Sequence, residues 1–552
     1  MFRIRTFLLC LLASTLAFAQ PQPSGRPPLP KPKLVLTVMV DQLRYDYLMR
    51  WRSEFHGGFH RMLTQGANFT NGHLGHYPTV TAMGHAGVLT GAYPINSGII
   101  GNDWYDRELG KNIESITDLN EKDFGVENDG PGASPRRLLV STLGDQMKMA
   151  GGPKPVVIGI SLKDRGAIMP SGHGADGAFW YDRQTGDFVS STYYFPQLPD
   201  WVNTYNARKL QDRYLGKNFL CPGESEPITK VPGSTGPMYY SSLWNTPYSS
   251  ELIVEFAKAA VEQYKMGQRD ATDLLTVSFS ANDSLGHRDG PDAASVHEMT
   301  VQTDRVLGEL FDYLDSKVGM PNILVVLSAD HGVAPVPEVN AERHMPGKRM
   351  PRRLLFDTLQ KALETKYGAG KWIEGMAGSS PYLNYKLIAE KKLDAKEMRT
   401  WLAEQALAIP GVTRVFTRDQ LMQGQVPPDQ IAQRIAKSYH PKRSGDLEIV
   451  LEPFWIGDGS RATHGSPYHY DSHIPMVFMG PGVRPGYYDA KVVMQDIAPT
   501  LAAMLEIEAP SGAEGRILGE MFQGPGEPGP RGMAPGRGGM QRGVRPGAPP
   551  VP

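Results

Sequence analysis

Polar side chains that can do chemistry follow four apolar runs of the sequence. Ligands in open α/β sheets bind beyond the carboxyl ends of strands, so such positions are candidates for one shared site. A single aspartate there is usually a turn or helix cap, but the repetition favours a functional site. The residues are Asp41, Lys163 with Arg165, Asp283 with His287, and Asp330 with His331.

A first set of metal ligands is predicted from helical spacing. Asp283 and His287 are four residues apart, so on a helix they share one face and both reach one ion. His464, in RATHGSPYHYDSHIP, would complete a three-ligand site with an open position. His469 and His473 lie in the same stretch, and spacing alone leaves them as alternatives to His464.

A second set consists of Asp41, Asp330 and His331. Carboxylate and imidazole ligands are typical of zinc, and they also accept manganese, iron or cobalt. Two ions about 4 Å apart can activate a nucleophile on one side and stabilise a leaving oxygen on the other. The two sets together therefore predict in-line phosphoryl transfer.

The nucleophile of such a reaction should be a hydroxyl, and the segment HYPTVTAMGH offers Thr79 and Thr81. A helix N-terminus after the proline would favour an alkoxide and a bound phosphate, although plain helix capping also explains a threonine there. Lys163 and Arg165 are two apart, so on an extended segment they point the same way and could clamp phosphoryl oxygens. Asn102 is a further candidate contact to the phosphate.

These residues require a sheet that brings strand ends together. Continuous apolar runs predict strands buried on both faces of a mostly parallel central sheet flanked by helices, an α/β fold. Three-to-four apolar spacing predicts helices over Glu251–Tyr264 and Ser295–Leu314. Two long intervals, about 172–250 and 335–455, are expected to be cap-like insertions in a catalytic domain spanning 34–520. The predicted strands are Leu34–Val40, Pro155–Ile160, Leu274–Phe279, Ile323–Leu327 and Pro475–Met479.

Composition excludes several classes of protein. The 57 basic and 58 acidic side chains give a formal net charge of -1, which argues against a dedicated nucleic-acid partner. Two cysteines, Cys10 and Cys221, exclude a disulfide scaffold and a Cys-rich zinc module. Any metal must therefore be held by His, Asp and Glu.

Both ends of the chain differ from the middle. Arg3 and Arg5 precede a short apolar run and the small residues of a cleavage site, so residues 1–19 are expected to be a signal peptide cut near Ala19. We expect an exported protein, periplasmic or secreted, with no membrane span, acting as a monomer. Residues 20–33 are expected to form a Pro-rich linker, and residues 524–552, rich in Gly, Pro and Arg, a disordered tail.

Six ordered motifs resemble the phosphate-irrepressible alkaline phosphatases of the PafA type, in the alkaline phosphatase superfamily and close to the type I phosphodiesterases and nucleotide pyrophosphatases. The resemblance runs from about Leu34 to Leu518 and implies an alkaline-phosphatase-like fold. The motifs are VDQLRYDYL, PTVTAMGH with TGAYP and GIIGNDWYD, KDRGAIMPSGHGADGAFWYD, the Asp283–His287 pair, ADHG and THGSPYHYDSHIP.

The resemblance implies an activity and a role for each candidate. Two zinc ions per chain and hydrolysis of small phosphate monoesters through a phosphothreonine intermediate are expected. Thr81 takes the place of the nucleophile, 21 positions before the phosphate-contacting Asn102, with Thr79 as the fallback. Lys163 and Arg165 match the pair that distinguishes monoesterases from the diesterase branch. One zinc is assigned to Asp283, His287 and His464, and the other to Asp41, Asp330, His331 and Thr81.

Three other functions compete with this prediction. A phosphodiesterase or nucleotide pyrophosphatase would use the same metals and nucleophile, but the Lys163 and Arg165 pair disfavours it. A sulfatase is disfavoured because the sequence has no Cys-x-Pro-x-Arg segment. A non-catalytic metal- or phosphate-binding protein would need neither Thr81 nor the cationic pair.

Overall fold

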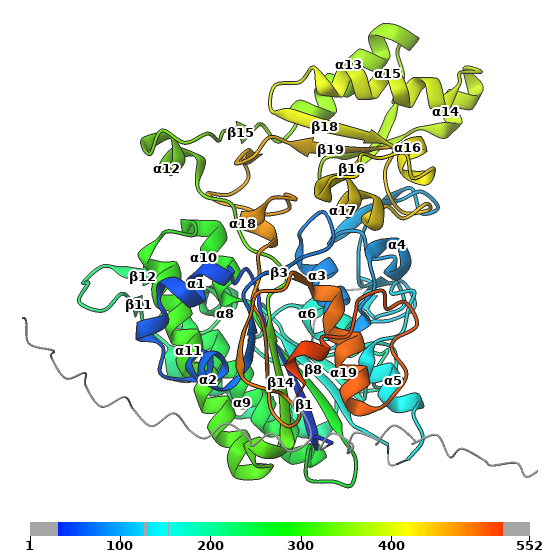
Figure 1. Cartoon of the computed structure of the whole chain (residues 1–552). Helices are drawn as coiled ribbons and strands as arrows, with labels where there is room; N and C mark the ends of the chain where they lie inside the picture. The colour runs from blue at the N-terminus through cyan, green and yellow to red at the C-terminus, as the bar shows by residue number, and fades with distance from the viewer. Residues whose placement is uncertain (1–30, 126–129, 153, 523–552) are drawn as a thin grey trace, which may run out of the picture.

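A nine-stranded mixed sheet forms the centre of the molecule, with helices on both faces (Figure 1). The computed structural model describes residues 31–125, 130–152 and 154–522. The expected signal peptide, nearly all of the linker and the C-terminal tail lie outside these residues. The strand order is β10-β9-β8-β13-β1-β14-β21-β2-β22, and the predicted α/β class is confirmed.

Five neighbouring strands in the middle of this sheet are parallel. The register pairs Leu34 of β1 with both Asp273 and Ile323. The three central strands therefore begin at the same position along the sheet and end within one residue of one another. Every residue of β1 is buried, as the continuous apolar run predicts for a strand covered on both faces. The five strands are β9 (Gly177–Tyr181), β8 (Val157–Ser161), β13 (Asp273–Phe279), β1 (Leu34–Val40) and β14 (Ile323–Ser328).

The outer strands make the sheet mixed. The fifth predicted strand, β21 (Met476–Met479), is antiparallel to both β14 and β2 (Ala67–Phe69). β22 (Gly486–Tyr488) pairs with β2 in parallel, and β10 (Phe188–Val189) closes the other edge antiparallel to β9. An apolar run that is buried on both faces carries no information on strand direction, so the sequence did not predict this reversal.

Helices on the two faces bury the sheet (Figure 1). One group consists of α2 (Gly58–Gln65), α9 (Pro247–Tyr264) and α11 (Ala294–Lys317). The other consists of α3 (Thr81–Thr90), α5 (Leu143–Met149), α6 (Asp164–Ser171) and α19 (Ile497–Leu505). The apolar positions of α11 that predicted it, Met299 to Leu314, face the main core. No helix among the described residues is both long and apolar enough to cross a membrane.

The residues about 172–250 divide between the sheet and a surface layer. They supply β9 and β10 and then α7 (Asp200–Ala207), β11 (Phe219–Leu220), β12 (Pro227–Thr229) and α8 (Pro237–Ser242). Phe188 stacks on Phe256 of α9 with ring centroids 4.1 Å apart. The first part of this stretch therefore belongs to the central sheet.

The segment between β14 and β21 has a hydrophobic core of its own and stands over one end of the sheet (Figure 1). Leu359, Trp372 and Leu402 are fully buried within it. Apart from the short α18 (His469–Ser472) next to β21, its elements are α12 (Pro337–Glu342), β15 (Arg349–Met350), α13 (Leu354–Tyr367), β16 (Ile373–Ala377), β17 (Ser380–Leu383), α14 (Tyr385–Glu390), α15 (Ala395–Leu407), β18 (Val412–Thr417), α16 (Arg418–Met422), α17 (Gln430–Ser438), β19 (Leu447–Leu451) and β20 (Ile456–Gly457).

Candidate active site

Three aspartates meet at the carboxyl ends of the central strands. Asp41 directly follows β1, Asp330 follows β14, and Asp283 lies in α10 (Ala281–Asp289), which begins after β13. Each of the three is at least 95% buried. Because β1 pairs in level register with both neighbouring strands, chain segments far apart in the sequence deliver these carboxylates to one place.

Lys163 reaches two of the three carboxylates from the end of β8. Its Nζ lies 2.8 Å from Asp41 Oδ2 and 2.6 Å from Asp283 Oδ2. Burial opposes the charge on Asp283, but the Lys163 ammonium and then His287 hold the pKa of that carboxyl well below its usual range. Burial, and then the negative charge of Asp41, raises the pKa of Asp330 to about 8. The three carboxylates therefore share a single lysine, and without a further cation burial favours the protonated form of Asp330.

Three histidines face these carboxylates in the same way. His287, His331 and His464 each place Nδ1 within hydrogen-bond distance of a backbone carbonyl, at 3.0, 2.9 and 2.7 Å. Their Nε2 atoms lie 3.2, 3.3 and 3.7 Å from an Asp283 or Asp330 oxygen. A metal-binding histidine ordinarily donates its other ring N–H to such an oxygen, which fixes the tautomer and the ring orientation.

The donor set could hold metal ions, in two neighbouring clusters. One ligand atom each from Asp283, His287 and His464 lies within 4.8 Å of the others, and so do atoms from Asp41, Asp330 and His85. Asp330 Oδ2 is buried and accepts no hydrogen bond within the described residues. Burying an ionised carboxylate oxygen that accepts no hydrogen bond costs folding free energy unless a cation neutralises the charge.

His85 and Gln42 belong to the site, although the sequence did not single them out. His85 Nδ1 lies 3.0 Å from the Thr81 carbonyl oxygen and its Nε2 lies 2.9 Å from the Ser278 hydroxyl, so both ring nitrogens already have protein partners. Gln42 donates from Nε2 to Asp283 at 2.8 Å. His85 comes four residues after Thr81, and this helical spacing was the available signal.

The structure separates the two candidate threonines. The Thr79 hydroxyl donates to the Ser466 carbonyl at 2.9 Å and accepts the Gly465 N–H at 3.2 Å. Thr81 is the first residue of α3, and its Oγ1 lies 3.5 Å from His331 Nε2. Thr79 is thus committed to the loop that carries His464, whereas the Thr81 hydroxyl faces the acidic and imidazole cluster.

Seven of the ten predicted site residues line one open hollow of about 610 Å³, the nucleophile hollow. The other three lie beside them: Asp41 contacts Lys163, His331 contacts Thr81, and Asp330 contacts His331. Asn102 accepts the Ala82 N–H at 2.8 Å through Oδ1, which leaves its NH₂ group to face a ligand. Arg165, in the first turn of α6, pairs loosely with Asp164 at 3.7 Å, and its Nε has no hydrogen-bond partner in the described chain. The seven are Thr81, Asn102, Lys163, Arg165, Asp283, His287 and His464.

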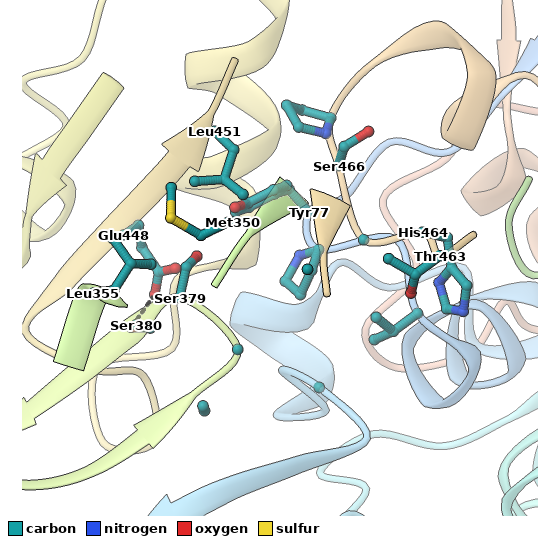
Figure 2. A pocket seen from close by; sticks show the side chains of 18 of the residues that line it. Tyr77, Met350, Leu355, Ser379, Ser380, Glu448, Leu451, Thr463, His464 and Ser466 are labelled. Atoms are coloured by element: carbon teal, nitrogen blue, oxygen red, sulfur yellow. Dashed lines mark hydrogen bonds between the residues drawn. The ribbon is translucent and has the colours of Figure 1, made fainter. Parts of the chain in front are cut away.

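A second cavity of about 670 Å³, the side cavity, opens beside the nucleophile hollow and shares Asn102 and His464 with it. Figure 2 shows Glu448 and Ser380 at one end and Thr463 with His464 at the other. Its outer wall comes from the segment between β14 and β21. Burial raises the pKa of Glu448 to about 7, and Ser380 donates a hydrogen bond to this carboxyl at 3.2 Å.

Comparisons with known proteins agree with this geometry. The family model described as type I phosphodiesterase / nucleotide pyrophosphatase matches residues 35–469. The alkaline phosphatase PafA of Elizabethkingia meningoseptica is 37% identical over 524 residues, which cover 89% of this chain and 95% of that protein. This chain belongs to that family of phosphatases and phosphodiesterases.

A second alkaline phosphatase and the PafA crystal structure match this chain over nearly their whole length. The alkaline phosphatase PhoV of Synechococcus elongatus is 34% identical, with 92% of this chain and 96% of that protein covered. The crystal structure of PafA superposes with a TM-score of 0.83 at 35% identity, covering 90% of this chain and all of the other. Murine ectonucleotide pyrophosphatase/phosphodiesterase 5, at 15% identity and a TM-score of 0.53, shares the fold.

Proposed function

We propose that this protein is an exported, zinc-dependent alkaline phosphatase that hydrolyses small phosphate monoesters through a phosphothreonine intermediate. Its alkaline phosphatase relatives identify it as a phosphoric monoester hydrolase of the alkaline phosphatase superfamily. The observation that carries the finer proposal is that Thr81, Asn102, Lys163 and Arg165 line one hollow beside the buried carboxylates and imidazoles. The proposal of export rests on the expected signal peptide, residues 1–19, with its cleavage site near Ala19.

The proposed reaction proceeds in two displacements. In the first, Thr81 Oγ loses its proton and bonds to phosphorus while the bond to the ester oxygen breaks, and the alcohol leaves after taking up a proton. In the second, water attacks the same phosphorus, the bond to Thr81 Oγ breaks, and the hydroxyl is restored as phosphate is released. Asp283, His287 and His464 would hold one zinc ion, and Asp41, Asp330 and His331 the other. The two ions would supply positive charge at the attacking and the leaving oxygen.

The protein's own charges act on the equatorial oxygens of the phosphoryl group. Arg165 and the NH₂ of Asn102 are free to donate to these oxygens, and Lys163 adds an ammonium that is already anchored by Asp41 and Asp283. The amides in the first turn of α3 also carry partial positive charge toward an anion at Thr81. Phosphoryl transfer depends mainly on such positioning and charge stabilisation.

A phosphodiesterase is the alternative, because the matching family model includes phosphodiesterases. A diester carries one negative charge less and needs room for a second organic group. The cationic pair Lys163 and Arg165 favours the dianionic monoester, and we therefore place the monoesterase first.

Metal removal tests the proposal. We expect the purified protein to hydrolyse p-nitrophenyl phosphate faster than bis-p-nitrophenyl phosphate, to lose about 10³-fold or more of this rate on chelation, and to regain it with zinc. Magnesium alone should restore less, because imidazole ligands favour zinc. A preference for the diester would contradict the monoesterase assignment and identify the protein as a phosphodiesterase. Turnover that is indifferent to chelation would overturn the metal assignment.

We further propose that the segment between β14 and β21 acts as a cap, and that the organic group of the ester enters the side cavity. Leu451→Trp would fill this cavity from β19. We expect kcat/KM for 1-naphthyl phosphate to fall about 10-fold or more while that for methyl phosphate stays within twofold, because losing an apolar contact costs about 1–3 kcal/mol.

The matched control for this variant is Leu407→Trp, which adds the same side chain on the surface, where Leu407 is 48% exposed. It should leave both substrates unaffected. Equal losses of naphthyl and methyl phosphate turnover in Leu451→Trp would show that the side cavity does not hold the ester group.

A further inference from the structure

A third histidine cluster lies outside the active site. One ring nitrogen each from His73, His469 and His473 lies within 4.8 Å of the others. His73 is buried, His473 is half-buried and His469 is exposed, so the cluster runs from the interior to the surface. None of these three side chains contributes to the proposed phosphatase reaction.

The backbone brings the three rings together. His73 of β3 (Gly72–His73) and His473 face each other across an antiparallel bridge. Two hydrogen bonds flank this bridge, from Leu74 N to the Ser472 oxygen at 2.8 Å and from Ile474 N to the Gly72 oxygen at 3.1 Å. His469 and His473 are four residues apart around the short helix α18 (His469–Ser472), which turns their side chains to one side.

Hydrogen bonds leave one ring nitrogen free on each of the two inner histidines. His473 Nε2 lies 2.9 Å from the Thr70 carbonyl oxygen, and His73 Nε2 lies 2.8 Å from Asn71 Oδ1. In a neutral imidazole this leaves the lone pair on Nδ1. His73 Nδ1 is buried and has no hydrogen-bond partner among the described residues. This is the arrangement of a metal ligand that is oriented through its other nitrogen.

We propose that His73, His469 and His473 form a further site for a divalent transition-metal ion, and zinc is the ion used to test it. Three imidazoles without a carboxylate suit zinc, nickel or copper and disfavour magnesium and calcium, which require oxygen ligands. The exposed His469 provides the entry path and leaves a fourth position open to solvent. Arg44, Arg434 and Lys491 lie near the cluster and oppose a cation there. Arg44 is paired with Asp46 at 2.7 Å, which reduces its share of the repulsion.

An ion at this site would link two segments that both enter the active site. His73 precedes Thr81 by eight residues, and His469 follows His464 by five. These two segments already exchange the hydrogen bonds between Thr79 and the residues 464–466. The additional ion would therefore stabilise the junction of the nucleophile segment with the His464 loop, without touching substrate.

The test is a count of bound zinc. The holoenzyme is brought to equilibrium by dialysis against a phosphate-free zinc buffer, and metal per chain is measured for the wild type, His469→Ala and the control His60→Ala. His60 is likewise an exposed histidine, it lies on α2, and it is not a member of the cluster. We expect His469→Ala to bind one zinc fewer per chain than the other two proteins, with p-nitrophenyl phosphate turnover unchanged in all three.

Two results would overturn the proposal. Equal zinc content in the wild type and His469→Ala would show that the cluster binds no ion. Occupancy of the same site by magnesium in a parallel dialysis would show an unselective cation contact instead of an imidazole site. Because the readout is the difference between two proteins with intact active sites, failure here is distinguishable from failure of the proposed phosphatase activity.

Discussion

Thr81→Ala is expected to lower kcat for p-nitrophenyl phosphate by about 10⁴-fold or more, the scale seen when a covalent nucleophile is removed. Thr81 Oγ1 is the hydroxyl at the N-terminus of α3 that faces His331, and no other described threonine lines the nucleophile hollow. Steady-state turnover, with the melting temperature measured in parallel, separates loss of chemistry from loss of fold. Acid-quenched protein should also carry labelled phosphate in the wild type and none in Thr81→Ala.

Two other threonines provide the controls. Thr90→Ala, at the far end of the same helix, removes a hydroxyl that donates to the Ala86 carbonyl oxygen and accepts the Ala92 N–H, both local contacts, and it should keep full turnover. Thr79→Ser keeps the hydroxyl that holds the His464 loop and should remain active. The assignment would be reversed if Thr81→Ala kept its turnover and trapped phosphate while substitution of Thr79 abolished both.

Arg165→Ala is expected to lower the rate of monoester hydrolysis much more than the rate of diester hydrolysis. Two charge-assisted hydrogen bonds at about 1.5–3 kcal/mol each correspond to a loss of about 10²–10⁴-fold for the monoester. The diester should lose about 10-fold or less, because it presents one negative charge fewer to the guanidinium. The measurement is kcat/KM for p-nitrophenyl phosphate and bis-p-nitrophenyl phosphate on the same preparations.

The geometry makes Arg165 the better member of the pair to substitute. Lys163 is locked between Asp41 and Asp283, so removing it would also leave two buried carboxylates without a cation. Arg165 makes one side-chain ion pair in the described chain, the loose one with Asp164, and lies near the acidic Asp103 and Glu114. Arg353→Ala, an exposed arginine in an i,i+4 pair with Asp357, is the matched control and should change neither rate. Equal losses on both substrates in Arg165→Ala would contradict the clamp.

His85 illustrates a residue whose role only the structure indicates. It lies close to Asp41 and Asp330, at 3.4 and 3.5 Å, as a ligand would. Its two nitrogens are nevertheless bonded to the Thr81 carbonyl oxygen and the Ser278 hydroxyl, whereas His331 leaves Nε2 toward the carboxylates. We therefore assign His85 to positioning Thr81 and keep His331 as the proposed ligand.

The sequence alone predicted the architecture and the neighbourhood of the site. Apolar runs buried on both faces identified five strands of the sheet, with β1 predicted at its observed bounds Leu34–Val40. Polar residues directly after those runs meet at one edge of the sheet, because parallel strands present their carboxyl ends there, and we propose this edge as the place of the chemistry. The motifs around Thr81, Asp283 and His464 identified the family, which the comparisons confirm.

Choices between near neighbours in the sequence needed the tertiary structure. The sequence pattern left Thr79 as a fallback to Thr81 and did not separate His464 from His469 and His473, because the partners of these side chains come from distant segments. Asp283 and His287 lie beside His464, whereas the other two histidines pack against His73. The reversed direction of β21 and the walls of the side cavity depend likewise on contacts between segments far apart in the chain, and local residue pattern does not encode such contacts.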